Sequence, residues 1–165
     1  MKKTVLAALL ALSLLLSCAA LADDDNVDTS AWSYYTFEGS AVAMKLPDDF
    51  EAMENDGENV VYFAGNEDVA LEVTALQEYT ELSQIVEDQK KLEYIEEVEI
   101  ENKNGIDIVE VEGWDDSVFG FFVISPEGTT YRFMFYPLFE TETGADGEDV
   151  AEAIFDTLAS SESII

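Results

Sequence analysis

Carboxylates are the most abundant side chains that could do chemistry in this sequence of 165 residues. Asp and Glu number 37 against seven Lys and Arg, and the formal net charge is −30. Two acidic stretches offer the hard oxygen ligands that Ca²⁺ prefers: Asp48, Asp49, Glu51 and Asp56 in one, and Glu142, Asp146, Glu148 and Asp149 in the other. Neither stretch has the ligand spacing of an EF-hand, so we expect solvated acidic loops, with weak Ca²⁺ binding as the alternative.

The residue types that are missing exclude several classes of enzyme. The chain has no His and only one Cys, so it has no Ser-His-Asp triad, no Cys-His pair and no Zn site. Its glycines form no nucleotide-binding loop, and its negative charge repels nucleic acid. A pair of carboxylates could still hydrolyse a glycoside, but 37 candidates single out no pair. We therefore expect no catalytic residue, no cofactor and no enzymatic activity.

Two further side chains are candidate partner anchors. Arg132 is the only Arg in the chain and lies between Tyr131 and Phe133, and Arg and aromatic residues dominate interface hot spots. The alternative for Arg132 is a place over a strand, paired with a neighbouring carboxylate. Trp114 stands at the end of a predicted strand. An exposed Trp there would indicate a binding edge, whereas a buried Trp is the more usual case.

The first 22 residues have the pattern of an export signal. Met1-Lys2-Lys3 precedes a thirteen-residue apolar run at 4–16, which is too short to span a bilayer comfortably. Ala20-Leu21-Ala22 then offers small residues to a signal peptidase, directly before Asp23. Cleavage there would leave five basic residues against 37 acidic ones, a formal charge of −32.

Cys18 allows a second route, because Leu15-Leu16-Ser17-Cys18 resembles a bacterial lipobox, in which the Cys carries the lipid. We favour cleavage after Ala22 and secretion. Lipidation of Cys18 is the alternative, and a membrane association would then depend on that anchor alone. On either route the folded part has no Cys and no disulfide.

Alternating apolar residues and turn signals predict eight strands in the rest of the chain. They form hairpins at 34–37 with 41–46, 59–64 with 69–76, 98–101 with 106–112, and 118–125 with 129–135. The acidic loop at 48–59 is expected to hold a helical turn at Phe50–Met53. The alternation reverses its phase in 106–112, which predicts a β-bulge near Ile108–Val109.

Two segments have helical periodicity. In 80–94 the stripe is Leu82, Ile85 and Val86, with Thr80 as the expected cap, and in 147–159 it is Val150, Ala151, Ile154, Phe155 and Leu158. In 118–125 both faces are apolar, which is typical of a central strand that is covered on both sides. We therefore predict an α+β fold, a three-layer α/β/α sandwich with a mainly antiparallel sheet and two principal helices. One domain spans 32–160, after a disordered acidic leader at 23–31 and before a frayed tail at 161–165.

The order of these elements resembles the PsbP-like family. The resemblance rests on the hairpin that ends at Met44-Lys45-Leu46-Pro47, on Phe50, on the helix at 80–94, on the Asn104-Gly105 hairpin and on the late aromatic strands with a closing helix. It implies a sandwich fold and a non-enzymatic binding or assembly module. Members include a photosystem extrinsic subunit, an import factor that binds a small GTPase, and exported bacterial lipoproteins. The resemblance transfers no site residue.

We predict an exported, non-catalytic binding or assembly module of the bacterial cell envelope. Its partner would be a protein or an envelope component, and not nucleic acid. The alternatives are a Ca²⁺-dependent binder and a carboxylate-only hydrolase. The acidity itself has three explanations, namely solubility beside an anionic cell wall, recognition of a cationic partner, and adaptation to high salt.

Overall fold

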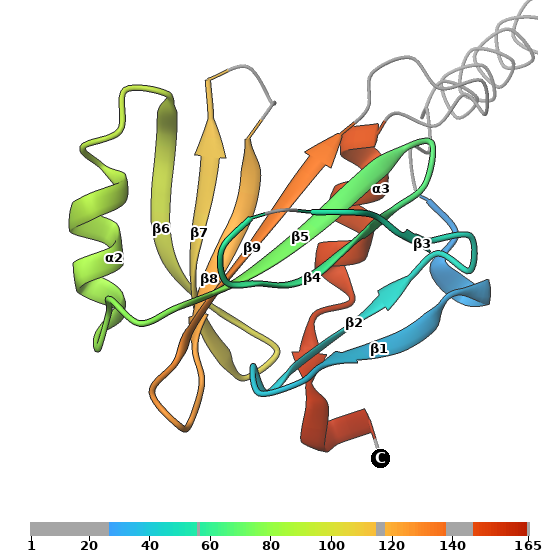
Figure 1. The fold of residues 1–165 in the computed structure, drawn as a ribbon, viewed down its shortest axis with the longest axis horizontal. Coiled ribbons are helices and arrows are strands. Elements are labelled where there is room, and N and C mark those ends of the chain that lie inside the picture. Colours follow the sequence, from blue (N-terminus) through green and yellow to red (C-terminus); the bar gives the residue numbers. More distant parts are fainter. Residues whose placement is uncertain (1–26, 56, 115–117, 138–146, 165) are drawn as a thin grey trace, which may run out of the picture.

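The strands form two antiparallel sheets in the computed structural model, which describes residues 27–55, 57–114, 118–137 and 147–164 (Figure 1). The larger sheet has the order β3-β4-β5-β9-β8-β7-β6, and the smaller one has the order β1-β2-β10. The bounds are β1 (Ser33–Phe37), β2 (Val42–Leu46), β3 (Glu51–Ala52), β4 (Val60–Gly65), β5 (Val69–Leu76), β6 (Ile95–Lys103), β7 (Ile106–Gly113), β8 (Phe119–Ile124), β9 (Thr130–Pro137) and β10 (Ala159–Ser160).

Two α-helices cover opposite faces of the seven-stranded sheet. On one face α3 (Gly147–Asp156) and the small sheet enclose the larger core, which is built around Phe121, Phe133 and Phe135. On the other face α2 (Leu82–Gln89) covers only the end formed by β6, β7 and β8 (Figure 1). Short 3-10 helices lie at Thr29–Ala31 and Ser161–Ile164. None of the helices in the described ranges has the length and apolar character needed to cross a membrane.

The expected three-layer α/β/α sandwich is wrong, since the fold is β-rich and contains two sheets. The opening hairpin does not join the large sheet. Its inner face, which includes Phe37, Val42 and Met44, packs on the core, and the free edge of β2 pairs with β10. The layer that was assigned to a helix is therefore shared by α3 and a second sheet. A two-residue strand such as β10 is too short to show a hydrophobic period, so the pattern did not reveal this pairing.

The predicted bulge near Ile108–Val109 is also wrong. The pairing of β6 with β7 is continuous there, and its irregularity lies between Ile95 and Glu97. Ile108 packs in the core under α3, whereas Val109 packs under α2. The alternation reverses because both faces of β7 are covered at this point.

The apolar stripe of α3 is confirmed for Val150, Ala151, Ile154 and Phe155, which are buried, whereas the helix ends at Asp156 and the buried Leu158 follows it. The two covered faces of β8 are confirmed as well, because Phe121 packs under α3 and Phe122 packs under α2. The helical turn at 50–53 is wrong, since β3 occupies part of that segment. The cap of α2 is Glu81, whose backbone N–H donates to the Gln84 side chain, in place of the expected Thr80.

Short 3-10 helices lie at both ends of the described chain. Val27 packs against the larger core and a 3-10 helix begins at Thr29, within the predicted leader. At the other end, the segment expected to fray forms a 3-10 helix directly after β10, and Ser161 donates a backbone hydrogen bond to Ala41.

Candidate functional site

Five glutamates gather on one face of the β6–β7 hairpin, beyond the area that α3 covers. They line a hollow of about 200 Å³ that we call the glutamate groove: Glu97, Glu99 and Glu101 from β6, and Glu110 and Glu112 from β7. Successive side chains of a strand point to opposite faces, so the alternate residues of β6 place their carboxylates together. The opposite face of the hairpin carries Val98, Val109 and Val111, which pack under α2.

The register of the hairpin brings like charges directly opposite each other. Glu97 pairs with Glu112, and Glu99 pairs with Glu110. Side chains in such cross-strand pairs have Cβ atoms about 5 Å apart, and like charges there destabilise the sheet. Pairing between the two strands therefore gives no reason for glutamates at these positions.

Glu110 is the half-buried member of the groove. Burial raises its pKa to about 7 from an ordinary 4.5, and the neighbouring Glu101 carboxylate adds to the rise, while Lys103 opposes it. Glu110 and Glu101 also share a hydrogen bond, which requires a proton on one of them. At neutral pH this carboxyl group can therefore either donate or accept a proton.

An ammonium group lies in the hollow that adjoins the groove. The Nζ of Lys103 lies 2.7 Å from Oδ1 of Asp156 in α3 and 3.5 Å from the ring centroid of Phe155. An adjoining hollow of about 310 Å³ continues from Glu101 and Glu110 to Phe119, Glu152 and these three residues. The tip of the hairpin is held against the end of α3, because Asn104 Nδ2 donates to the Leu158 carbonyl at 2.6 Å.

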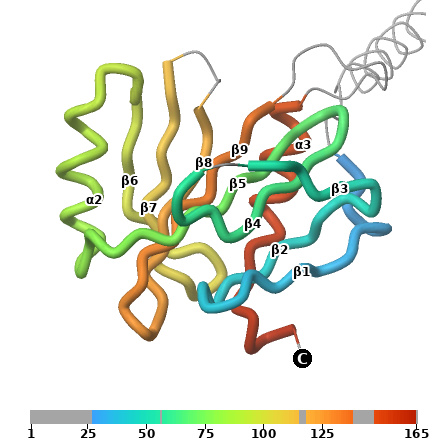
Figure 2. The backbone as a smooth tube through the Cα atoms, in the orientation of Figure 1, coloured from blue at the N-terminus to red at the C-terminus, as the bar shows by residue number. Residues whose placement is uncertain are grey.

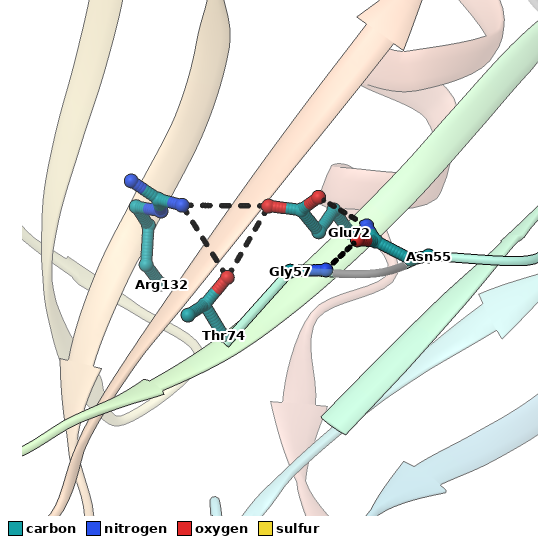
Figure 3. Close-up of polar contacts among 5 residues, drawn as sticks. All are labelled: Asn55, Gly57, Glu72, Thr74 and Arg132. Atoms are coloured by element: carbon teal, nitrogen blue, oxygen red, sulfur yellow. Dashed lines mark hydrogen bonds and ion pairs between the residues drawn. The ribbon is translucent and has the colours of Figure 1, made fainter. Parts of the chain in front are cut away.

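Arg132 lies over β9 on the other face of the sheet, where it pairs with a carboxylate (Figure 3). Its Nη2 is 3.4 Å from Oε1 of Glu72 and 3.3 Å from Oγ1 of Thr74, both on β5. Oε2 of Glu72 accepts a 2.7 Å hydrogen bond from Asn55, whose Oδ1 accepts one from the Gly57 N–H. Nε of Arg132 is buried without a hydrogen-bond partner in the described part of the chain.

This network gives Arg132 a structural task. It ties the β3–β4 loop to the face of the sheet through Glu72 and Asn55 (Figure 3). Only one guanidinium nitrogen takes part, and the side chain is 36% exposed. A role for Arg132 in binding a partner stays a prediction.

Trp114 is exposed, contrary to the more usual case. Its side chain is 65% accessible and follows β7, beside the exposed Tyr94 at the start of β6. The Trp114 N–H donates to the Tyr94 carbonyl at 3.4 Å, so the two residues occupy the same end of the hairpin. The structure places Trp114 at an edge, where it could contact a partner.

The other candidates from the sequence are not brought together. Among the described residues there is no group of three or more side chains placed to hold a metal ion. Asp49 accepts a hydrogen bond from Asn66, and Glu148 and Asp149 lie in the first turn of α3, where the helix dipole favours carboxylates. Asp56, Glu142, Asp146 and the lipidation candidate Cys18 lie outside the described residues.

Sequence reasoning missed the glutamate groove, although a signal was present. The Asn104-Gly105 turn favours a two-residue hairpin loop. That loop pairs Lys103 with Ile106, and counting outward then places Glu99 opposite Glu110. No protein-family model matches the chain, and no curated protein matches its sequence.

Proposed function

We propose that this protein is an exported, non-catalytic binding or assembly module of the cell envelope, which holds a cationic partner in the glutamate groove. The observation that carries the proposal is the gathering of five glutamates on one face of the hairpin, with Glu97 opposite Glu112 and Glu99 opposite Glu110. The predicted export signal supports the proposed place in the cell envelope, and the absence of His excludes His-based catalysis. The resemblance to the PsbP-like family stays a prediction.

The physical argument is one of stability. Opposite charges in cross-strand pairs contribute about 0.2–1 kcal/mol each, and like charges cost a similar amount. A Lys in place of one member of each pair would turn a cost into a gain. A hairpin that retains glutamates on both strands is therefore adapted to a positive charge that comes from elsewhere.

Lys103 indicates which kind of cation fits. Its ammonium group is held by a carboxylate and by the face of an aromatic ring in the hollow that adjoins the groove. Cation–π contact and a charged hydrogen bond are the means by which proteins recognise amines. Lysine side chains of a partner protein would find carboxylate acceptors along the glutamates of the groove.

The proposal is tested by calorimetric titration with a short Lys-rich peptide. The triple variant Glu97→Gln, Glu99→Gln and Glu101→Gln should bind at least about tenfold more weakly, a loss of about 1.4 kcal/mol. The matched control is the triple variant Glu51→Gln, Glu54→Gln and Glu58→Gln, which removes as much charge from exposed positions near β3. Equal losses in the two triple variants would show that only the overall charge attracts the peptide, and the groove would then have no specific role.

A carboxylate-only hydrolase is the second candidate, and Glu110 favours it. A carboxyl group with a pKa of about 7 beside other carboxyl groups has the properties of a general acid. Assays with chromogenic glycosides would show turnover that is lost in Glu110→Gln. In contrast, a binding module shows no turnover and retains its affinity for the Lys-rich peptide in that variant below pH 7, where Glu110 is already neutral.

A further inference from the structure

A second surface lies at the opposite side of the molecule, where the edge of the small sheet meets the large sheet. A hollow of about 250 Å³ is lined there by Tyr35, Phe37, Glu38, Val61 and Tyr62, which we call the aromatic groove. The ring centroids of Tyr35 and Tyr62 are 4.8 Å apart, and Phe37 lies 4.9 Å and 5.1 Å from them. These aromatic residues belong to β1 and β4, whereas the glutamate groove is on β6 and β7 (Figure 2).

The strand that borders the aromatic groove has a free edge. Among the residues that the structure describes, β1 is the outermost strand of its sheet and pairs only with β2. Its residues Ser33–Thr36 are all exposed, and Tyr34 and Tyr35 are 44% and 43% accessible. An unpaired strand edge presents backbone N–H and C=O groups that can pair with another chain, and natural proteins usually protect such edges with charges or bulges. β1 has neither device.

The side of the aromatic groove opposite β1 is formed by β4, at a point where its pairing is irregular. The register of β4 against β5 shifts between Val60 and Tyr62, which leaves Val61 as an extra residue that is 55% exposed. Bulges occur near binding sites, where they redirect a side chain. The loop that leads into this bulge is anchored by Asn55 to Glu72, and through Glu72 to Arg132 (Figure 3).

Charge decides which occupant fits. A second copy of the chain would bring a further net charge of −30 to the interface, so pairing of two β1 edges would be opposed by repulsion. The aromatic groove has one carboxylate, Glu38, and no basic side chain among the residues that line it. An extended segment with Lys or Arg residues has the complementary charge, and its backbone can complete the edge of β1.

We propose that the aromatic groove is a docking site for an extended, basic segment of another protein, which adds a strand to the free edge of β1. Alternate side chains of such a strand lie over Tyr35 and Tyr62, where apolar or aromatic groups stack. A Lys or Arg near the end of the segment reaches Glu38. This site goes beyond the proposed function, since it is on another edge and depends on backbone pairing.

The test uses a short blocked peptide of alternating Lys and Tyr as the probe, with a Glu and Tyr peptide as its counterpart. The protein carries Glu97→Gln, Glu99→Gln and Glu101→Gln, so that the glutamate groove does not compete for the peptide. The result then tests the aromatic groove separately from the proposed function. NMR spectra report which backbone amides shift and become protected from hydrogen exchange. The basic peptide should protect amides of β1 and leave those of β6 unchanged, and the acidic peptide should have no effect.

Substitutions in the aromatic groove then separate the possible results. Tyr35→Ser should weaken binding at least about tenfold, whereas Tyr94→Ser, at an exposed Tyr far from β1, should change it less than about twofold. Val61 is exposed enough to accept charge without loss of the fold, so Val61→Lys should weaken binding and Val61→Glu should strengthen it. Protection at β6 alone, equal effects of Tyr35→Ser and Tyr94→Ser, or a dimer with protected β1 amides in the absence of peptide would each overturn the proposal.

Discussion

Replacing Glu110 by Gln should make the stability of the protein less dependent on pH. The folded protein holds a proton on Glu110 up to about pH 7, whereas the unfolded chain loses it near 4.5. Between these values the native state binds more protons, so the free energy of unfolding falls as pH rises and the loss is complete above about pH 7. Gln at this position stays neutral in both states and removes this dependence.

The size of the loss in stability follows from the pKa shift of Glu110. A rise from 4.5 to about 7 corresponds to about 3.4 kcal/mol at about 1.36 kcal/mol for each pH unit. Glu110 is only half-buried, so solvent screening reduces the effect, and we expect about 1.5 kcal/mol. For a domain of this size, that difference changes the melting temperature by about 5 °C.

The assay is thermal and urea unfolding from about pH 5 to about pH 9 at constant ionic strength. Wild type and Glu110→Gln should have similar stability at the acid end, and the variant should be the more stable protein above about pH 7. Glu96→Gln is the control, because Glu96 is exposed on the neighbouring strand β6 and does not line the groove. If the stability of Glu110→Gln changes with pH in parallel with that of wild type and Glu96→Gln, then Glu110 has an ordinary pKa. The description of Glu110 as a half-buried, protonated member of the groove would then be wrong.

Three other predictions concern packing, export and charge. A Cβ at Gly120 would collide with the Phe133 carbonyl oxygen, so Gly120→Ala should lower the free energy of unfolding in urea by about 1–3 kcal/mol, and a loss below about 0.5 kcal/mol would contradict this. Cys18→Ala should leave export and release into the medium unchanged. If the wild type is labelled by a fatty acid and retained in membranes, and the variant is not, cleavage after Ala22 would be contradicted. Repulsion among carboxylates should make the melting temperature rise between about 0.1 M and about 1 M NaCl, with no extra effect of Ca²⁺ at matched ionic strength, whereas a saturable shift with Ca²⁺ and not with Mg²⁺ would reveal a specific site.

Most of the elements could be predicted because their information is local. The stripe of α3 and the two apolar faces of β8 follow from periods of 3.6 and 2 residues, and the Asn104-Gly105 turn follows from its backbone preference. All three are present in the structure. The reversal of phase around Ile108 was visible in the sequence, but its cause was not, because a bulge and a second covered face produce the same pattern.

The candidate sites were less accessible to sequence reasoning. Trp114 was expected in the core on general grounds, and its exposure depends on where the β6–β7 hairpin ends relative to α2 and α3. The aromatic groove joins Tyr35 with Tyr62 across two sheets, and neither residue has a local signal that points to the other. The glutamate groove could be predicted in part. Its cross-strand pairs follow from the Asn104-Gly105 turn, whereas the partial burial of Glu110 depends on the tertiary structure.

The amino-acid sequence by itself determined the number of long strands, the two amphipathic helices, the exclusion of His- and Cys-based chemistry, and the excess of negative charge. These features depend on residue type and short-range periodicity, which the chain carries wherever it folds. Only the tertiary structure decided that β2 pairs with β10, that the hairpin of β1 and β2 forms a second sheet, and that Glu110 lies among other carboxylates. Such contacts join residues that are distant along the chain, and the competition among alternative pairings is settled by which arrangement buries the most apolar surface at once.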